Sequence, residues 1–528
     1  MSNTHDIEQD GQIIVSGSQG RTHRITVPSG ESATFRGRVT DKWGRTSPWS
    51  SAITASSQSE GTVERLGLHI TTQELAIWRD RWDNGVQGDS FLNTRVSEER
   101  SRVTNNRNSF TSNPSGSLWQ IPSMGTDSQG RYNTEPSYST LRNSAARVRD
   151  AAFHSLITQD SNTMQQVASI LAAQPDQTRC QFATDPGWAV PAAQSMRDAA
   201  VPAFGFCHAM VTNLHTYDYV RSAVNEGWVS DPFTSAQHTK LRNWYKAWAD
   251  YCEESNTWRV NRPFVDRLND NYTLSSYASD PNDLWHHGSH TYRNSSGQSI
   301  GPRVHRAHNL WNNRDSSLAR YIMLYGLAFD EQFYIDRAWR WCRDFVRYTL
   351  YPEGVMSDWH RWDIWPNYST LQGTHVLTAV DAYTRKTGDT SLYDYETTLG
   401  IHDTTGAPVA PANDAGKSFL FLIQSYARHA KREYAVDRWT EAHRMDYRQN
   451  RSGGGNRGLH DRFIWANIYY RDMGHSRDWY RGINGVHEWT VTGNGTNDLN
   501  DTWAFPSPYL MWAGLEGQIW PYPGVPQP

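Results

Sequence analysis

A change in the spacing of hydrophobic residues near Leu66 constrains the fold of this chain more than any other feature. Before this point the apolar residues occur in short, β-branched segments separated by Gly, Pro and Ser, which is typical of β-strands. After it they recur every three to four residues almost to the end of the chain, which is the period of amphipathic helices. We therefore predict a small β-rich module with a linker over residues 1–61 and a mainly helical domain over residues 62–528.

The helical domain repeats amphipathic segments in pairs. The stripes consist of Leu141, Ala145, Val148, Ala152 and Leu156; of Leu318, Tyr321, Ile322 and Tyr325; of Tyr334, Ala338, Trp341, Phe345 and Tyr348; of Val376, Ala379, Val380 and Tyr383; and of Phe419, Leu422, Ile423, Tyr426 and Ala430. Gly388 is a suitable end of one helix, and Asp330 is a suitable start of another. Helix hairpins that continue over about 350 residues predict an (α/α) toroid or incomplete barrel, because the core of a compact bundle does not extend so far.

The β module contains four predicted strand segments, at residues 13–17, 23–27, 33–41 and 51–56. The segment from Ser32 to Ser56 resembles the last strands of a fibronectin type III domain, with a strand, a D-x-x-G turn and an S-x-W-S sequence before the final strand. Only part of such a domain is present. The resemblance therefore implies an incomplete sandwich or one that a partner completes.

The composition indicates the class of ligand. A net charge of −4 excludes the broadly basic surface of a nucleic-acid-binding protein. The chain has 24 Trp, 26 Tyr and 16 Phe, and aromatic rings both fill cores and stack on sugar faces. Only six of its 51 basic residues are Lys, and Arg binds carboxylates and sulfates in a bidentate manner. These features favour an acidic carbohydrate.

Other classes of partner and location find no support in the sequence. No apolar stretch reaches the roughly 18 residues of a membrane span, and Met1 to Asp10 lacks the pattern of a signal peptide. The four cysteines lack the spacing of metal ligands, so we expect buried thiols, with one disulfide left open. We predict no metal, no cofactor and no contact with a membrane.

Two clusters of polar and aromatic residues mark the candidate site. Asn312 to Asp315 precede one apolar stripe, and Asp358 to Tyr368 precede another, so each cluster lies where a helix begins. In a toroid the ends of alternate helices share one face, and two such segments can converge on a cleft. Ordinary N-capping by Asn and Asp is the alternative interpretation of the first cluster.

The region over residues 303–383 resembles the alginate lyases of the (α/α) toroid type. In that family an N-N-H sequence opens a helix, a turn containing Gly follows, and an Arg and then a Tyr precede the next helix. This chain has N-N-R at positions 312–314, then Y-P-E-G, Arg361 and Tyr368. Arg361 follows Asn313 by 48 residues and precedes Tyr368 by seven, which matches the spacing of the family.

The resemblance implies β-elimination on a uronate-containing polysaccharide. The C5 proton of a uronate becomes removable when its carboxylate is neutralised, which the Asn313 amide and a guanidinium can do. Tyr368 would act as base at C5 and as acid at the leaving O4, with Arg361 favouring its phenolate form. Arg314 replaces the His of the family and cannot act as a base, so we expect syn elimination of a β-mannuronate or β-glucuronate unit.

Further residues of the two clusters are candidates for substrate binding. They are Asn312, His308, Trp311, Trp359, His360, Trp362 and Trp365. The tryptophans can instead pack between helix ends. His305, His308, His360 and His375 are reserve candidates for the base.

Two other functions remain open. Glycoside hydrolysis on the same fold would use carboxylates from Glu353, Asp358 and Asp363. A non-catalytic carbohydrate-binding or virion attachment protein is the second. The partial β module and the low Lys content fit a bacteriophage depolymerase, so we expect an extracellular or virion-associated protein whose N-terminal module contacts other virion proteins.

Overall fold

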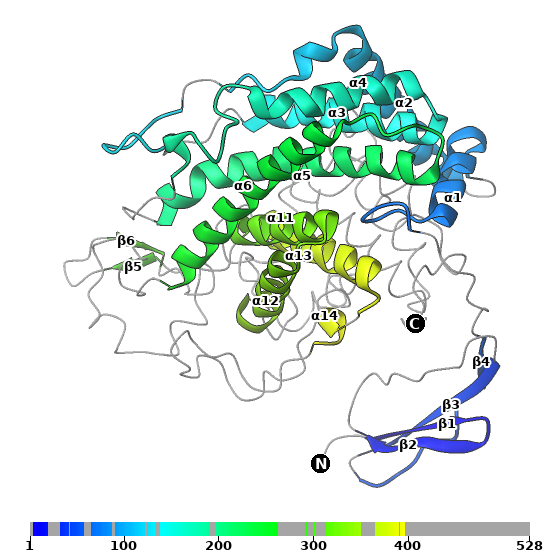
Figure 1. Cartoon of the computed structure of the whole chain (residues 1–528). Helices are drawn as coiled ribbons and strands as arrows, with labels where there is room; N and C mark the ends of the chain where they lie inside the picture. Colours follow the sequence, from blue (N-terminus) through cyan, green and yellow to red (C-terminus); the bar gives the residue numbers. More distant parts are fainter. Residues whose placement is uncertain are drawn as a thin grey trace. The chain divides into compact units, whose positions relative to one another are not determined.

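The computed structural model describes residues 4–18, 32–41, 43–56, 65–86, 90–121, 124–132, 138–189, 196–261, 291–293, 299–302, 313–349, 365–389 and 391–395. The chain divides after Glu64 into two compact units, a β unit and a helical unit (Figure 1).

The β unit is one antiparallel sheet with the strand order β2-β1-β3-β4. Its strands are β1 (Thr4–Gln9), β2 (Gln12–Ser18), β3 (Ser32–Thr40) and β4 (Ile53–Ser56). Asp10 and Gly11 connect β1 to β2 with φ angles of 49° and 86°, as a two-residue hairpin turn requires. Strand β1 lies in a segment that we did not predict as β, and the predicted strand at 23–27 lies outside the described residues.

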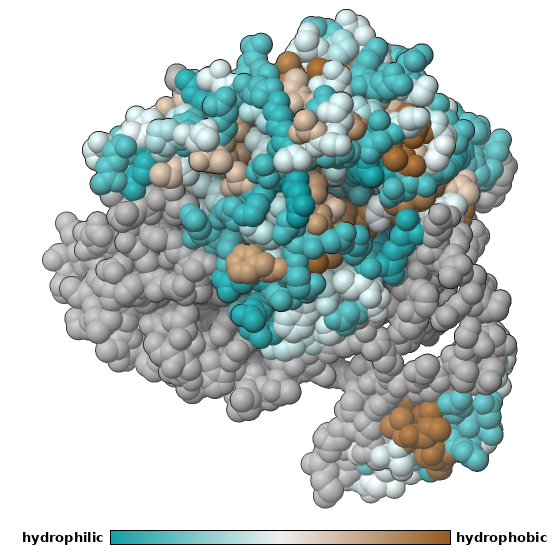
Figure 2. Space-filling model, viewed as in Figure 1, coloured by the Kyte–Doolittle hydropathy of each residue, from teal (hydrophilic) through white to brown (hydrophobic). Residues whose placement is uncertain are grey.

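One face of this sheet carries ion pairs between directly opposite residues of β1 and β3. Arg38 Nε donates to Asp6 at 2.8 Å, and Arg36 Nε donates to Glu8 at 2.9 Å. The Arg38 guanidinium also lies 4.5 Å from the ring centroid of Trp49. Figure 2 shows an apolar patch on the visible surface of this unit, and its exposed large hydrophobic residues are Ile13, Ile14, Trp43 and Ile53.

The helical unit confirms the prediction of a mainly helical chain. Its helices are α1 (Thr72–Asn84), α2 (Ser90–Ser112), α3 (Tyr138–Thr158), α4 (Ser161–Ala173), α5 (Met196–Glu226), α6 (Ser235–Asn261), α11 (Asn313–Phe329), α12 (Gln332–Thr349), α13 (Trp365–Thr387) and α14 (Ser391–Asp394). A hairpin that we did not predict is formed by β5 (Thr291–Arg293) and β6 (Ser299–Pro302). Among the described residues, no helix is long and apolar enough to cross a membrane.

Gly388 ends α13 as predicted, whereas Asp330, which we predicted as the start of a helix, follows the end of α11, and α12 begins at Gln332. Both residues have positive φ angles, of 53° and 72°, and follow the last turns of α11 and α13. Such left-handed residues end helices because they turn the chain out of the helical path. At the start of α1, Thr71 and Glu74 form a capping box, which satisfies two backbone N–H groups.

The predicted apolar stripes form the core where the structure describes them. Leu141, Leu318 and Val376 are each at most 1% exposed, and the stripe that begins at Phe419 lies outside the described residues. Many of the aromatic rings pack in the same core. A cluster of them consists of Trp119, Phe182, Trp188, Phe206, Trp244, Trp248 and Tyr251. These rings therefore serve packing.

Helices α11 and α13 lie side by side and run parallel (Figure 1). In the first turn of α11, Ser316 Oγ lies 3.0 Å from Nδ1 of His375 in the middle of α13. Just beyond the end of α11, Asp330 pairs with Lys386 in the last turn of α13 at 3.0 Å. Because these contacts advance in the same direction along both helices, the two N-termini lie at the same end.

Helix α5 joins this parallel row on the other side of α11. Cys207 Sγ contacts the carbonyl oxygen of Ser317 at 3.2 Å, and ten residues later Tyr217 stacks on Phe329 with ring centroids 5.3 Å apart. Helix α3 in turn packs parallel to α5, because Phe153 lies against Tyr219, and Arg79 bonds both the Leu156 carbonyl near the end of α3 and Glu226 at the end of α5. The order across the row is therefore α3, α5, α11 and α13.

Three helices of this row are followed in the chain by a helix that returns beside them. Only Gln159 and Asp160 connect α3 to α4, and only Asp330 and Glu331 connect α11 to α12, so these neighbours are antiparallel. Helix α6 is antiparallel to α5, because Tyr245 contacts Asn213 whereas the earlier His238 contacts the later Tyr217. The repeated unit is thus a helix hairpin.

Candidate functional site

The N-terminal turn of α11 carries the first predicted cluster. Asn313 is its first residue, Arg314 is partly buried, and Asp315 and Ser316 are at most 1% exposed. The side chain of Asn313 lies outside the description. The prediction that this cluster opens a helix is confirmed.

The second cluster ends in the first turn of α13, which begins at Trp365 and contains Tyr368. The side chains of both residues lie outside the description, so their backbone alone is placed. His375, two turns after Tyr368, is fully buried and contacts Ser316 of α11. The reserve candidate His375 therefore packs between helices.

A buried polar cluster that we did not predict lies between α5, α11 and α13, next to the first turn of α11. The rings of His375 and His208, which belongs to α5, have centroids 5.3 Å apart. Arg320 Nη2 lies 3.5 Å from Nδ1 of His208, and both side chains are fully buried. Burial lowers the pKa of His208 well below its usual value, and the neighbouring His375 and Arg320 lower it further. His208 is thus neutral at pH 7 beside a buried guanidinium.

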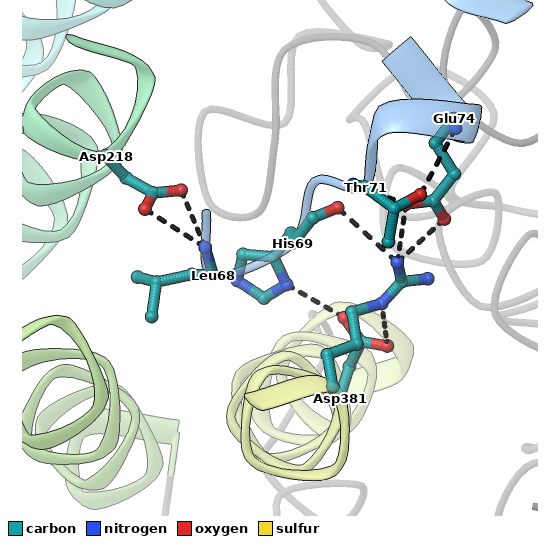
Figure 3. A network of polar contacts seen from close by, with 7 residues as sticks. Leu68, His69, Thr71, Glu74, Asp218 and Asp381 are labelled. Carbon is teal, nitrogen blue, oxygen red and sulfur yellow. Dashed lines mark hydrogen bonds and ion pairs between the residues drawn. The ribbon is translucent and has the colours of Figure 1, made fainter. Parts of the chain in front are cut away.

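A second polar network lies toward the other end of the row, around the segment over residues 65–71 (Figure 3). His69 Nδ1 lies 2.8 Å from Asp381 of α13, and the Leu68 N–H donates to Asp218 of α5 at 3.0 Å. Arg385, in the last turn of α13, donates to Asp381 at 2.8 Å and to Glu74 of α1 at 2.7 Å. This segment therefore bridges the C-terminal halves of α5 and α13.

The charges of this network are held out of solvent. Glu74, Asp381 and Arg385 are each at most 2% exposed. Burial lowers the pKa of His69, and the hydrogen bond with Asp381 opposes this effect only in part. A His paired with a carboxylate can transfer protons, but His69 is only 1% exposed, so its geometry supports a structural role.

Asp218 of α5 carries a buried carboxyl group at this end of the row. Burial raises its pKa to about 7, against the opposing effect of the Leu68 N–H. Gly67 lies so close that a Cβ on it would be 2.7 Å from a carboxylate oxygen of Asp218. The turn at Gly67 and Leu68 is therefore fitted against α5.

Most of the predicted site residues lie outside the part of the chain that the structure describes. Those outside the described residues are His305, His308, Trp311, Asn312, Glu353, Asp358, Trp359, His360, Arg361, Trp362 and Asp363. The two segments that the structure does bring to one end are the starts of α11 and α13. Sequence reasoning missed His208, Arg320 and Asp381, although Arg320 and Asp381 each interrupt an apolar stripe, which is a recognisable signal.

The described residues contain no group of three or more His, Cys, Asp or Glu side chains suited to a metal ion. No protein-family model and no curated protein matches this chain.

Proposed function

We propose that the helical unit is a polysaccharide lyase of the (α/α) toroid type that cleaves an acidic, uronate-containing polysaccharide by β-elimination. The observation that carries the proposal is the parallel packing of α11 against α13. Because of it, Asn313 and Arg314 at the start of one helix and Tyr368 at the start of the other belong to the same end of the row.

The levels of these positions along the row agree with a shared site. Ser316 lies beside His375, so Asn313 lies near the level of Gln372. Tyr368 is four residues before Gln372, which corresponds to about one helical turn or about 6 Å along the axis. A single sugar unit at this end can therefore be reached from both helix starts.

The arrangement of the hairpins supports the toroid. A row of parallel helices, three of which are followed by an antiparallel partner, is what an inner and an outer layer of such a fold require. The segment over residues 65–71 crosses between α5 and α13 at the C-terminal end of the row. We therefore assign the cleft to the N-terminal end of the row, where α11 and α13 begin.

The proposed reaction needs only groups of this chain. The Asn313 amide, Arg314 and the positive ends of the α11 and α13 dipoles neutralise the uronate carboxylate. The Tyr368 phenolate removes the C5 proton, the C4–O4 bond breaks as the C4–C5 double bond forms, and the same hydroxyl returns the proton to O4. Arg361 lowers the pKa of Tyr368 in this scheme.

The test is Tyr368→Phe, which removes one oxygen and little volume. We expect at least about a 100-fold loss in formation of the unsaturated product, followed by its ultraviolet absorbance, with polymer binding retained. Tyr383→Phe is the matched control, because Tyr383 lies near the other end of α13, where its hydroxyl contacts Asp389. That control should keep its activity.

The same assay separates the competing functions. Wild-type protein that produces reducing ends without the unsaturated product is a hydrolase, and protein that binds the polymer without cleaving it is an attachment protein. A Tyr368→Phe variant with wild-type product formation would remove the proposed base. The extracellular or virion-associated location, and contact of the β unit with other virion proteins, belong to the same proposal.

A further inference from the structure

Two of the four cysteines face each other inside the α5–α6 hairpin. Cys207 of α5 and Cys252 of α6 are fully buried, and the two thiols are close enough for each to shift the pKa of the other. The register of the hairpin agrees with this contact, because Phe206 packs on Trp248, and Asn213 lies opposite Tyr245. The two thiols are therefore brought together by the helices themselves.

We propose that Cys207 and Cys252 form a disulfide that cross-links α5 to α6 when the chain folds under oxidising conditions. All four cysteines lie within the described residues, and all four are free thiols in this structure. Cys180 instead accepts a hydrogen bond from Gln174 at 3.4 Å, and Cys342 belongs to α12. The contacts therefore select one pairing.

The two thiols differ in their readiness to ionise, which assigns the attacking group. Burial raises the pKa of Cys252 well above its usual value, and contact with Cys207 adds to this. Burial opposes ionisation of Cys207 as well, but the neighbouring Cys252 thiol and the Arg320 guanidinium lower its pKa. The thiolate therefore forms first on Cys207.

The reaction is a balanced exchange with a low-molecular-weight disulfide. The Cys207 thiolate attacks one sulfur of that molecule, its S–S bond breaks, and one small thiolate leaves. Cys252 then loses its proton to water and attacks Sγ of Cys207, which releases the second small thiolate. The two protein thiols lose two electrons, and the small disulfide gains them.

The cross-link has a defined position and a defined loop. Cys207 also contacts the carbonyl oxygen of Ser317 near the start of α11, so the disulfide would lie next to the first turn of this helix, which begins at Asn313. The cysteines are 45 residues apart, and a bridge across a loop of this length restricts the unfolded chain appreciably. Because both thiols are buried once folding is complete, we expect oxidation in a nearly native state that already has the contacts of Cys207 with Cys252 and Arg320 but still admits a small disulfide.

The experiment is refolding of the full chain in a buffer of reduced and oxidised glutathione, followed by thiol counting in denaturant and peptide mapping. We expect two free thiols per chain, one cross-linked peptide pair containing Cys207 and Cys252, and an unfolding midpoint a few degrees above that of the reduced protein. Cys180→Ala and Cys342→Ala should keep this cross-link and leave one free thiol each. Cys252→Ala should lack it.

Three results would overturn the proposal. The first is four free thiols in protein that has regained its helical circular dichroism spectrum. The second is a cross-link that includes Cys180 or Cys342. The third is glutathione attached to Cys207 of the wild-type chain with no bridge to Cys252. Each is read from the wild-type protein, so none depends on the folding of a variant.

Discussion

Arg385→Met tests whether the buried network around the segment over residues 65–71 holds the helical unit together. Arg385 is 2% exposed, and its guanidinium lies between the carboxylates of Glu74 and Asp381. It donates hydrogen bonds to them at 2.7 and 2.8 Å, respectively. Met keeps most of the apolar stem and removes the charge. The two buried carboxylates then lose this cation.

The expected cost follows from this burial. Removal of one member of a buried ion pair destabilises a protein by about 3–5 kcal/mol, because the partner keeps its desolvation cost. Glu74 retains its bonds to Thr71, and Asp381 retains His69, so we expect about 3–4 kcal/mol for Arg385→Met. Arg242→Met is the matched control. Arg242 pairs with Glu331 with its own side chain 53% exposed, and such pairs contribute at most about 1 kcal/mol.

The pH dependence distinguishes lost charge pairing from lost packing. In the variant, the two carboxylates lose this cation while they stay buried, and burial favours the protonated form of a carboxyl group. The folded variant then binds more protons than the unfolded chain at mildly acidic pH, so its deficit relative to wild type shrinks as the pH falls from 7.5 to 5. Denaturant unfolding, followed by circular dichroism at pH 7.5 and pH 5, measures both effects. A deficit equal to that of Arg242→Met, or one unchanged with pH, would refute the reasoning.

Three further predictions concern other parts of the chain. Wild-type stability should fall as the pH rises from about 4 to about 7, because a carboxyl with a folded-state pKa of about 7 binds its proton more tightly in the folded state, and Asp218→Asn should remove this fall. Urea titrations across this range should show a pH-dependent change in the free energy of unfolding that is larger in wild type than in the variant by a value approaching about 4 kcal/mol. Arg314→His should leave the elimination rate within about tenfold and widen the range of uronates cleaved, since His adds a second base; product formation on several polymers checks this. Deletion of residues 1–61 should leave the far-UV helical signal and the activity of the helical unit intact, and loss of the cooperative unfolding transition would show that the β unit contributes to its core.

Helix boundaries and core residues were the most predictable part of this fold. Leu318, Val376 and their stripes are spaced for one buried face, and local signals such as Gly388 end the helices. The strand β1 was missed because its residues are mostly polar. The Asp10–Gly11 pair was the available signal, since this dipeptide favours a two-residue hairpin turn.

The buried polar residues were much less predictable. His208, Arg320 and Asp381 are fully buried, and no local sequence pattern predicts which distant charged residue each of them contacts. Asp381 meets His69 across 312 residues of sequence, and Arg385 meets Glu74 across 311. Such pairs depend on which helices become neighbours, a choice made by packing of the whole unit rather than by any segment.

The two ends of the row of parallel helices differ in their proposed roles. The starts of α11 and α13 carry the proposed site, and the network around residues 65–71 at the other end stabilises the fold. Arg385 lies 17 residues after Tyr368 in the same helix, which is about 25 Å along its axis. A change at Arg385 should therefore reduce the stability of the unit while folded molecules keep their rate of elimination. If Arg385→Met instead loses activity although its molecules remain folded, then the loss of the Arg385 contacts at the C-terminal end must shift α13 along its whole length. The N-terminal end would then depend on the network around residues 65–71 for its geometry as well as for its folding.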